Sequence, residues 1–87
     1  MTLETVDPLA VRRNEIAEMA ADLFCVSVEE VVSAESFADD VDADSLLVIE
    51  LLSRLEKRYG ITITDADVVR LVNLSATCEL VAECAGR

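Results

Sequence analysis

The stretch from Asp44 to Gly60 constrains the fold more than any other part of this 87-residue chain. Asp44 is a strong N-cap residue, because its carboxylate can accept hydrogen bonds from the unpaired N–H groups of a first helical turn. Gly60 suits the left-handed position that follows a helix. We therefore predict a helix over residues 45–59, about 22 Å long at 1.5 Å per residue. Steps of three and four residues predict an inward face of Leu46, Ile49, Leu52, Leu55 or Glu56, and Tyr59.

Three more helices are predicted from their start signals. Asp7-Pro8 begins the first, over residues 8–24, because proline fits the first helical position, where its missing N–H has no partner to lose. Thr64 to Asp67 opens a short helix over residues 65–72, and Asn73 caps a last one over residues 74–85. Ile61-Thr62-Ile63 is expected to be an extended connector. With only two glycines and one proline, the chain suits a helical bundle better than a turn-rich sheet protein.

A long connection over residues 25–41 joins the first helix to the second. Ser27-Val28-Glu29-Glu30 has the spacing of a capping box, which predicts a short helical turn around residues 28–32. Phe37 and Val41 are expected to anchor the polar remainder. We predict one all-α domain over residues 1–87: a four-helix bundle of three longer helices and one short helix, with a long first loop.

The charge and residue types of the chain exclude several classes of function. A net charge of −11, from 18 acidic and 7 basic residues, argues against nucleic acid and membranes as partners. It favours contact with basic patches on other proteins. Histidine is absent, which excludes Ser–His–Asp and Cys–His catalytic sets and zinc sites that use histidine. The sequence therefore favours a domain that contacts other proteins and excludes catalysis by histidine-based sets.

The three cysteines, Cys25, Cys78 and Cys84, lack CxxC spacing. Cys78 and Cys84 are expected near the inner face of the last helix, and Cys25 is expected at the exposed end of the first. Neither a signal peptide nor a run of transmembrane length is recognised. We expect a reduced, cytoplasmic monomer.

Three aspartates lead up to Ser45. Asp40, Asp42 and Asp44 have the spacing of a calcium-binding loop, but Ser45 stands where the sharp turn needs glycine, and Leu51 stands where the loop needs a bidentate glutamate. We therefore predict no metal site. Ser45 also lacks a base that could activate it as a nucleophile. Two interpretations remain open: Asp44-Ser45 only caps a helix, or Ser45 is modified at the positive end of that helix.

Asp44-Ser45-Leu46, then Ile49-Glu50-Leu51, and then the run from Leu55 to Ile61 resemble the acyl carrier protein family over nearly the whole chain. The resemblance implies a non-catalytic carrier whose serine, here Ser45, holds 4′-phosphopantetheine. A separate phosphopantetheinyl transferase would add that arm from coenzyme A, using magnesium. The thiol of the arm would hold an acyl chain as a thioester and deliver it to ketosynthase, acyltransferase-type or acyl-activating enzymes.

The resemblance also implies that the second long helix and the end of the first loop form the docking face. We expect this face to include Asp42, Leu46, Leu47, Glu50 and Arg54, with Leu47 and Glu50 exposed. As a further hypothesis, an acyl chain tucks between the helices against Phe37, Ile49, Leu52 and Val68.

Three departures from the family pattern bear on the pathway. Asp42 stands where the family often has glycine, and Leu47 stands where it often has a polar or acidic residue. The second long helix carries Arg54, Lys57 and Arg58 beside its acids. Leu47 suggests a docking surface unlike that of a fatty-acid carrier. The run over residues 54–61 resembles discrete carriers of polyketide and related secondary metabolism, and this resemblance favours such a carrier over one of fatty-acid synthesis. A D-alanyl or peptidyl carrier, and an acidic helical interaction domain without covalent chemistry, are the alternatives.

Overall fold

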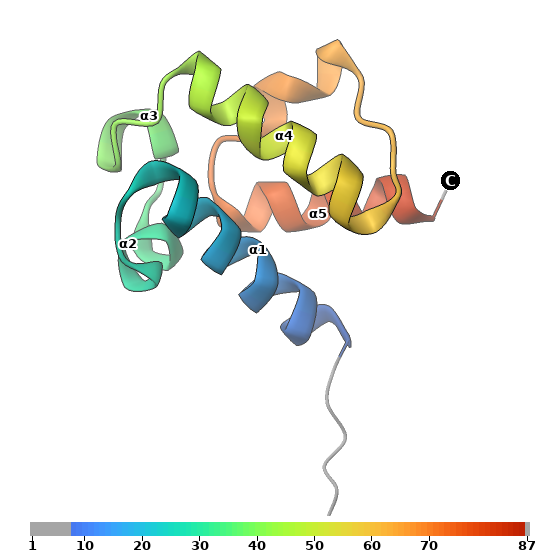
Figure 1. Cartoon of the computed structure of the whole chain (residues 1–87), viewed down its shortest axis with the longest axis horizontal. Helices are drawn as coiled ribbons and strands as arrows, with labels where there is room; N and C mark the ends of the chain where they lie inside the picture. The colour runs from blue at the N-terminus through green and yellow to red at the C-terminus, as the bar shows by residue number, and fades with distance from the viewer. Residues whose placement is uncertain (1–7, 87) are drawn as a thin grey trace, which may run out of the picture.

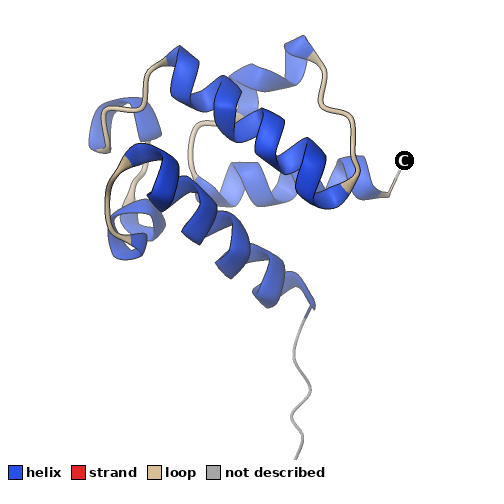
Figure 2. Cartoon of the chain, viewed as in Figure 1, coloured by secondary structure: helices blue, strands red, loops and turns tan. Residues whose placement is uncertain are grey.

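The computed structural model describes residues 8–86, which form helices and connecting loops (Figures 1 and 2). In chain order the elements are α1 (Pro8–Phe24), α2 (Val28–Ser33), α3 (Phe37–Asp40), α4 (Ser45–Tyr59), the 3₁₀ helix η1 (Asp65–Arg70) and α5 (Leu74–Ala85). The described part of the chain contains no strand, and the predicted all-α class is confirmed. The expected cap Asp7 lies outside the described residues.

The first connection is more helical than the sequence predicts. The capping box at the start of α2 is present: the Glu30 N–H donates to Ser27 Oγ, and the Ser27 N–H donates to Glu30 Oε1, both at 3.1 Å. The four-residue α3 is an addition. Ser36 caps it, and the Phe37 N–H donates to the Val72 carbonyl at 2.7 Å. A contact from a distant segment therefore fixes α3, which explains why local patterns miss it.

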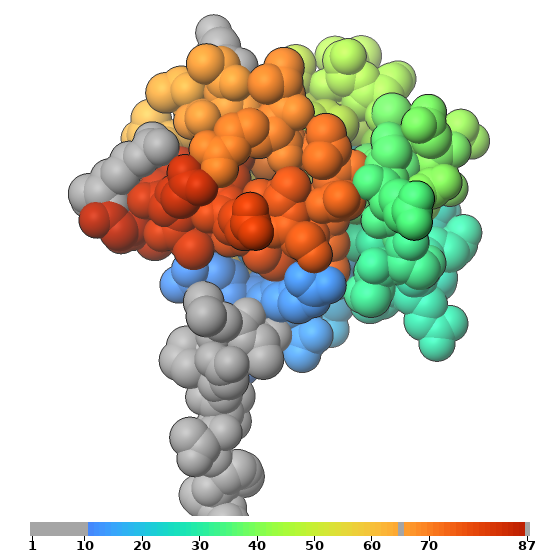
Figure 3. All heavy atoms as spheres, turned by 180° about the vertical axis from the view of Figure 1, so that it is seen from behind, coloured from blue at the N-terminus to red at the C-terminus, as the bar shows by residue number. Residues whose placement is uncertain are grey.

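The third predicted helix, over residues 65–72, is present in a shorter form. It is a 3₁₀ helix that ends at Arg70, and the Leu71 N–H donates to the Val68 carbonyl at 3.0 Å. Adjacent β-branched residues, Val68 and Val69, lower the preference for an α-helix. Seen from behind, η1 and α5 form one continuous surface, bordered by the first connection (Figure 3).

The core gathers small and branched residues from α1, α4 and α5. Its fully buried members include Ile16 and Ala20 of α1, Leu51 and Leu55 of α4, and Leu80 and Val81 of α5. Phe37 and Val41 are buried, which confirms the anchors predicted in the first connection. Cys25 is exposed, Cys78 is half-buried and Cys84 is buried, also as predicted.

The inward face of α4 is predicted wrongly at two positions. Leu46 is 74% exposed and Ile49 is 47% exposed, whereas Leu51 is fully buried. Residues 46–49 are all apolar, so they fit either of two helix rotations. The observed rotation buries Leu51, Leu52 and Leu55, with Val48 and Tyr59 partly buried beside them. Two large apolar side chains consequently face solvent beside Ser45.

Tyr59 joins α4 to α1 through polar contacts. Its Oη donates to Glu15 Oε1 at 2.8 Å, and Arg58 donates to Glu15 Oε2 at 2.9 Å. The guanidinium groups of Arg12 and Arg58 lie 5.6 and 5.4 Å from the centre of the tyrosine ring. Burial, followed by the hydrogen bond to Glu15, raises the pKa of Tyr59 to about 12.

This shift yields a direct test, because Tyr59 is the only tyrosine and the chain has no tryptophan. The absorbance of tyrosinate at 295 nm should rise with a midpoint of about 12 in the folded protein and of about 10 in urea. The pKa of Tyr59 is higher in the folded protein than in the unfolded chain. The contribution of Tyr59 to the free energy of unfolding is therefore complete below pH ~10 and is lost as the pH rises through the folded pKa. Identical midpoints in both states would contradict the contact.

Candidate functional site

Ser45 is the first residue of α4, directly after the cap. The Asp44 side chain accepts the Leu47 N–H at 3.0 Å, and the Asp44 carbonyl accepts the Val48 N–H at 3.1 Å. The predicted N-cap is therefore confirmed, and both Asp44 and Ser45 are exposed. The Ser45 hydroxyl lies at the positive end of the dipole of a 15-residue helix. Such a position favours a bound or covalently attached phosphate.

Ser45 and Ser53 are the two serines of the described region whose hydroxyls make no hydrogen bond. Ser27 and Ser36 cap short helices, Ser33 donates to the Glu29 carbonyl, and Ser75 accepts from Arg13. Ser53 is exposed but lies in the middle of α4, away from the free N–H groups. Within residues 8–86, Ser45 alone combines a helix start, exposure and a hydroxyl without a hydrogen bond.

The loop before Ser45 is held firmly on both sides of Asp42. The Ala43 N–H donates to the Phe37 carbonyl at 3.0 Å, and Ala43 is only 2% exposed. Asp42 itself is exposed and has a left-handed φ of 55°. This conformation reverses the chain and so directs Asp44 toward the start of α4. It also explains why glycine is a natural alternative at this position.

Two acids upstream of Ser45, Asp40 and Asp44, accept hydrogen bonds from the backbone. Asp40 Oδ2 accepts the Glu35 N–H at 2.7 Å and the Ser36 N–H at 3.1 Å, which ties the start of α3 to its end. In the described ranges, no group of three or more histidine, cysteine or acidic side chains could hold a metal ion. The aspartate spacing thus serves a loop and a helix cap.

An open groove of about 410 Å³ lies beside Ser45. One side consists of Phe37 and Ala38 of α3, and the other consists of Val68 and Val69 of η1. The start of α4 forms the end that carries Ser45. Of the four residues expected to contact an acyl chain, Phe37 and Val68 line this groove, whereas Ile49 and Leu52 do not.

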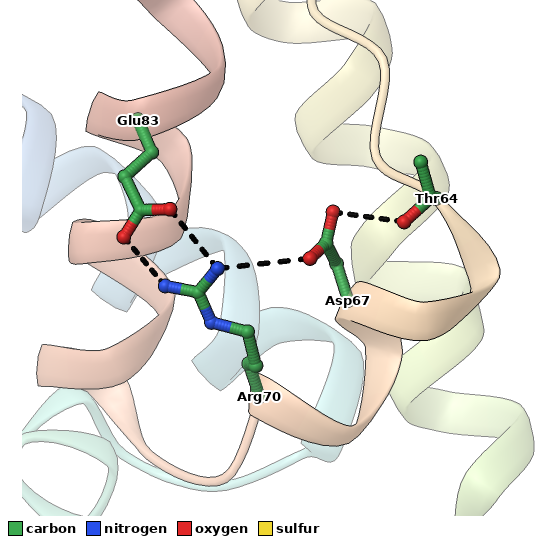
Figure 4. Close-up of polar contacts among 4 residues, drawn as sticks. All are labelled: Thr64, Asp67, Arg70 and Glu83. Atoms are coloured by element: carbon green, nitrogen blue, oxygen red, sulfur yellow. Dashed lines mark hydrogen bonds and ion pairs between the residues drawn. The ribbon is translucent and has the colours of Figure 1, made fainter.

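An ionic clamp fixes the η1 wall of the groove to α5 (Figure 4). Arg70 donates to the two carboxylate oxygens of Glu83 at 3.0 and 2.6 Å, and it lies 3.6 Å from Asp67. Thr64 donates to Asp67 at 2.9 Å. The sequence predicted Thr64 and Asp67 only as the start of a helix, and it gave no sign of the contact between Arg70 and Glu83 or of the exposure of Val69.

The expected docking residues are exposed, with one exception. Asp42, Leu46, Glu50 and Arg54 are exposed, and Arg54 pairs with Asp22 at 3.4 Å. Leu47, which was expected to be exposed, is half-buried and packs against the core. The rotation of α4 that exposes Leu46 and Ile49 turns Leu47 partly inward. A polar substitution at Leu47 therefore tests folding rather than docking alone.

The known proteins similar to this chain include acyl carrier proteins, and its matching family is that of phosphopantetheine attachment sites. The sequence model of the family described as "Phosphopantetheine attachment site" matches residues 14–81. The chain is 35% identical over 71 residues to polyketide-8 synthase acyl carrier protein 2 of Streptomyces avermitilis, covering 82% of each chain. It is 38% identical over 76 residues to acyl carrier protein 1 of that synthase, covering 87% of this chain and 90% of the relative. An acyl carrier protein of Petrotoga mobilis is 32% identical over 70 residues, covering 80% of this chain and 82% of that relative.

Within residues 8–86, no helix is both long enough and apolar enough to cross a membrane.

The left-handed backbone at Asp42 predicts a stability difference between two substitutions. Asp42→Val should destabilise the protein by about 1–2 kcal/mol, because a β-branched side chain strains this conformation. Asp42→Gly should leave stability within about 0.5 kcal/mol of the native value, since relief of strain offsets lost chain entropy. Urea unfolding followed by circular dichroism measures both values. The matched control is Thr62→Val, at an exposed position without positive φ. Equal stabilities for Asp42→Val and Asp42→Gly would refute the prediction.

Proposed function

We propose, since this chain belongs to the acyl carrier protein family, that its 4′-phosphopantetheine arm is attached to Ser45 and carries polyketide-type acyl intermediates as thioesters. The family is non-catalytic, and 4′-phosphopantetheine is its prosthetic group. The observation that carries the assignment is the free hydroxyl of Ser45 at the capped start of α4. This residue also lies within the matched region, residues 14–81.

The attachment step follows from the chemistry of coenzyme A. The Ser45 oxygen attacks the phosphorus next to the pantetheine, and a new P–O bond forms. The bond to the second phosphate breaks, which releases adenosine 3′,5′-bisphosphate, while the hydroxyl proton passes to a base of the transferase. The helix N-terminus then faces the new phosphodiester, and its dipole stabilises that charge by about 0.3–1 kcal/mol.

The polyketide assignment is supported by two relatives, both named polyketide-8 synthase acyl carrier proteins. The groove beside Ser45 also supports acyl cargo, because its walls of Phe37, Val68 and Val69 are apolar. A fatty acyl chain or an aminoacyl group is the alternative cargo. We place the whole function in one domain that acts as a cytoplasmic monomer.

Delivery needs a face that partner enzymes can recognise. We assign this face to the start of α4 and the loop before it, with Asp42, Leu46, Glu50 and Arg54 exposed, and with Leu47 contributing its outer edge. The partners are the phosphopantetheinyl transferase and enzymes of the ketosynthase, acyltransferase or acyl-activating classes. An apolar contact at Leu46 is favoured because this side chain is 74% exposed.

Loading of the arm can be measured by intact mass. Incubation with coenzyme A, magnesium and a broad-specificity phosphopantetheinyl transferase should add the mass of one phosphopantetheinyl group. Ser45→Ala should abolish the gain, whereas Ser53→Ala, on the same helix, should be loaded like the native chain. If a control carrier is loaded under the same conditions and this chain is not, the proposed function is wrong.

Docking can be separated from folding by two substitutions at exposed positions. Glu50→Lys and Leu46→Asp should each lower the kcat/KM of the transferase about tenfold, with the carrier as the varied substrate, because both remove complementary contacts near Ser45. Their helical circular dichroism should match that of the native chain. Glu79→Lys makes the same charge change at an exposed position on α5 and should leave the rate unchanged. An equal loss in the Glu79 variant would mean that net charge, rather than this face, determines the rate.

A further inference from the structure

The outermost residues of α4 change character along the helix. We define its outer stripe as Leu46, Glu50, Ser53 and Lys57, which follow one another at steps of four, three and four residues and are all exposed. The stripe is apolar beside Ser45, acidic one turn later, and basic near the end of the helix. A partner that lies along α4 therefore meets opposite charges at its two ends.

The rest of the chain strengthens this polarity. Between Cys25 and Ser53 there are eight acidic residues and no basic one, namely Glu29, Glu30, Glu35, Asp39, Asp40, Asp42, Asp44 and Glu50. Three of the seven basic residues then follow within five positions: Arg54, Lys57 and Arg58. The stretch that leads to Ser45 and the first half of α4 is thus acidic and contains no basic residue, whereas the second half of α4 holds three basic residues and one acid, Glu56.

Only some of these charges are available to a partner. Arg54 pairs with Asp22 at 3.4 Å, and Arg58 pairs with Glu15 at 2.9 Å and lies over the Tyr59 ring. Lys57 and Glu50 are exposed and have neither an ion pair nor a hydrogen bond to side chains in the described region. They are about 10 Å apart along the helix axis, which is close to the Debye length at physiological salt. Separate groups on a partner can therefore pair with Glu50 and with Lys57.

From this arrangement we infer that the partner enzymes of this carrier have a bipolar docking surface. Such a surface has a basic group opposite Glu50, an apolar seat for Leu46 and Ile49, and a carboxylate opposite Lys57. The inference rests on the proposed function, because it assumes that α4 is presented to enzymes that act on an arm at Ser45. The two charges fix the direction in which α4 lies on the partner, since reversal would bring like charges together. Lys57 also repels surfaces that are basic throughout, so it acts against wrong partners.

A simpler role for Lys57 makes a different prediction. A cation in the last turn of a helix interacts favourably with the helix dipole. If Lys57 served only this purpose, replacing it would lower stability slightly and would affect all partners equally. If partners have the bipolar docking surface, the effect of replacing Lys57 on acyl transfer should instead depend on the charge of the partner's surface.

The experiment compares two ketosynthases of known structure as probes. The first has only lysine and arginine around the entrance to its active site, and the second has carboxylates about 10 Å beyond its basic residues. Each carrier variant is first loaded with an acylated arm, and the kcat/KM for acyl transfer to each ketosynthase is then measured. The native chain should favour the second probe. Lys57→Gln should reduce that preference, and Lys57→Glu should raise transfer to the first probe about tenfold while lowering transfer to the second.

Controls separate the possible failures. Ser75→Asp changes the net charge by the same amount as Lys57→Gln, but at an exposed position on α5, next to Arg13. It should leave the preference unchanged, and the effects at Lys57 should shrink at high salt. Equal changes toward both probes, or the same effect from Ser75→Asp, would overturn the bipolar surface. Failure of the variants and the native chain to take up the arm would instead overturn the proposed function, because loading is measured first.

Discussion

The burial of Phe37 is the interaction on which the rest of the site depends. Its side chain is 1% exposed, and its ring meets the edge of Phe24 with the ring centres 5.2 Å apart. Its N–H bonds to the Val72 carbonyl, and its carbonyl accepts the Ala43 N–H. One residue therefore connects α1, the loop between η1 and α5, and the loop before Ser45. Removing a buried phenylalanine costs about 3–5 kcal/mol, a large share of the total stability of a domain this small.

The small size of the domain shapes what it can do chemically. A chain of 87 residues has little interior to spare, so its groove is open rather than enclosed. The Ser45 hydroxyl makes no hydrogen bond to another side chain in the described region, and the chain has no histidine that could activate it. In the proposed function, activation, transfer and enclosure of the cargo are left to the partner enzymes. This division explains why the most distinctive features of the chain lie on its surface.

The sequence predicts best those features that short-range chemistry determines. The Asp44 cap, the Gly60 stop and the Ser27 capping box each depend on residues within a few positions, and all three are present. The existence of α3 depends in part on a distant segment, through the hydrogen bond from the Phe37 N–H to the Val72 carbonyl. The rotation of α4 was ambiguous because its four consecutive apolar residues, 46–49, fit two rotations of the helix. Only packing against the shared core decides that Leu46 and Ile49 are exposed and Leu47 is half-buried.

The acids around Ser45 are best explained by partners rather than by the arm itself. A phosphodiester on Ser45 adds negative charge beside Asp42 and Asp44, which are both exposed. The helix N-terminus offsets this repulsion only in part, since its contribution is about 0.3–1 kcal/mol and is weakened by salt. If Ser45 carries the proposed arm, these acids would offer it no binding advantage, whereas they would attract a basic enzyme surface over several ångströms. Their repulsion of the phosphodiester would also favour the apolar side of Ser45, where Val68 and Val69 line the groove.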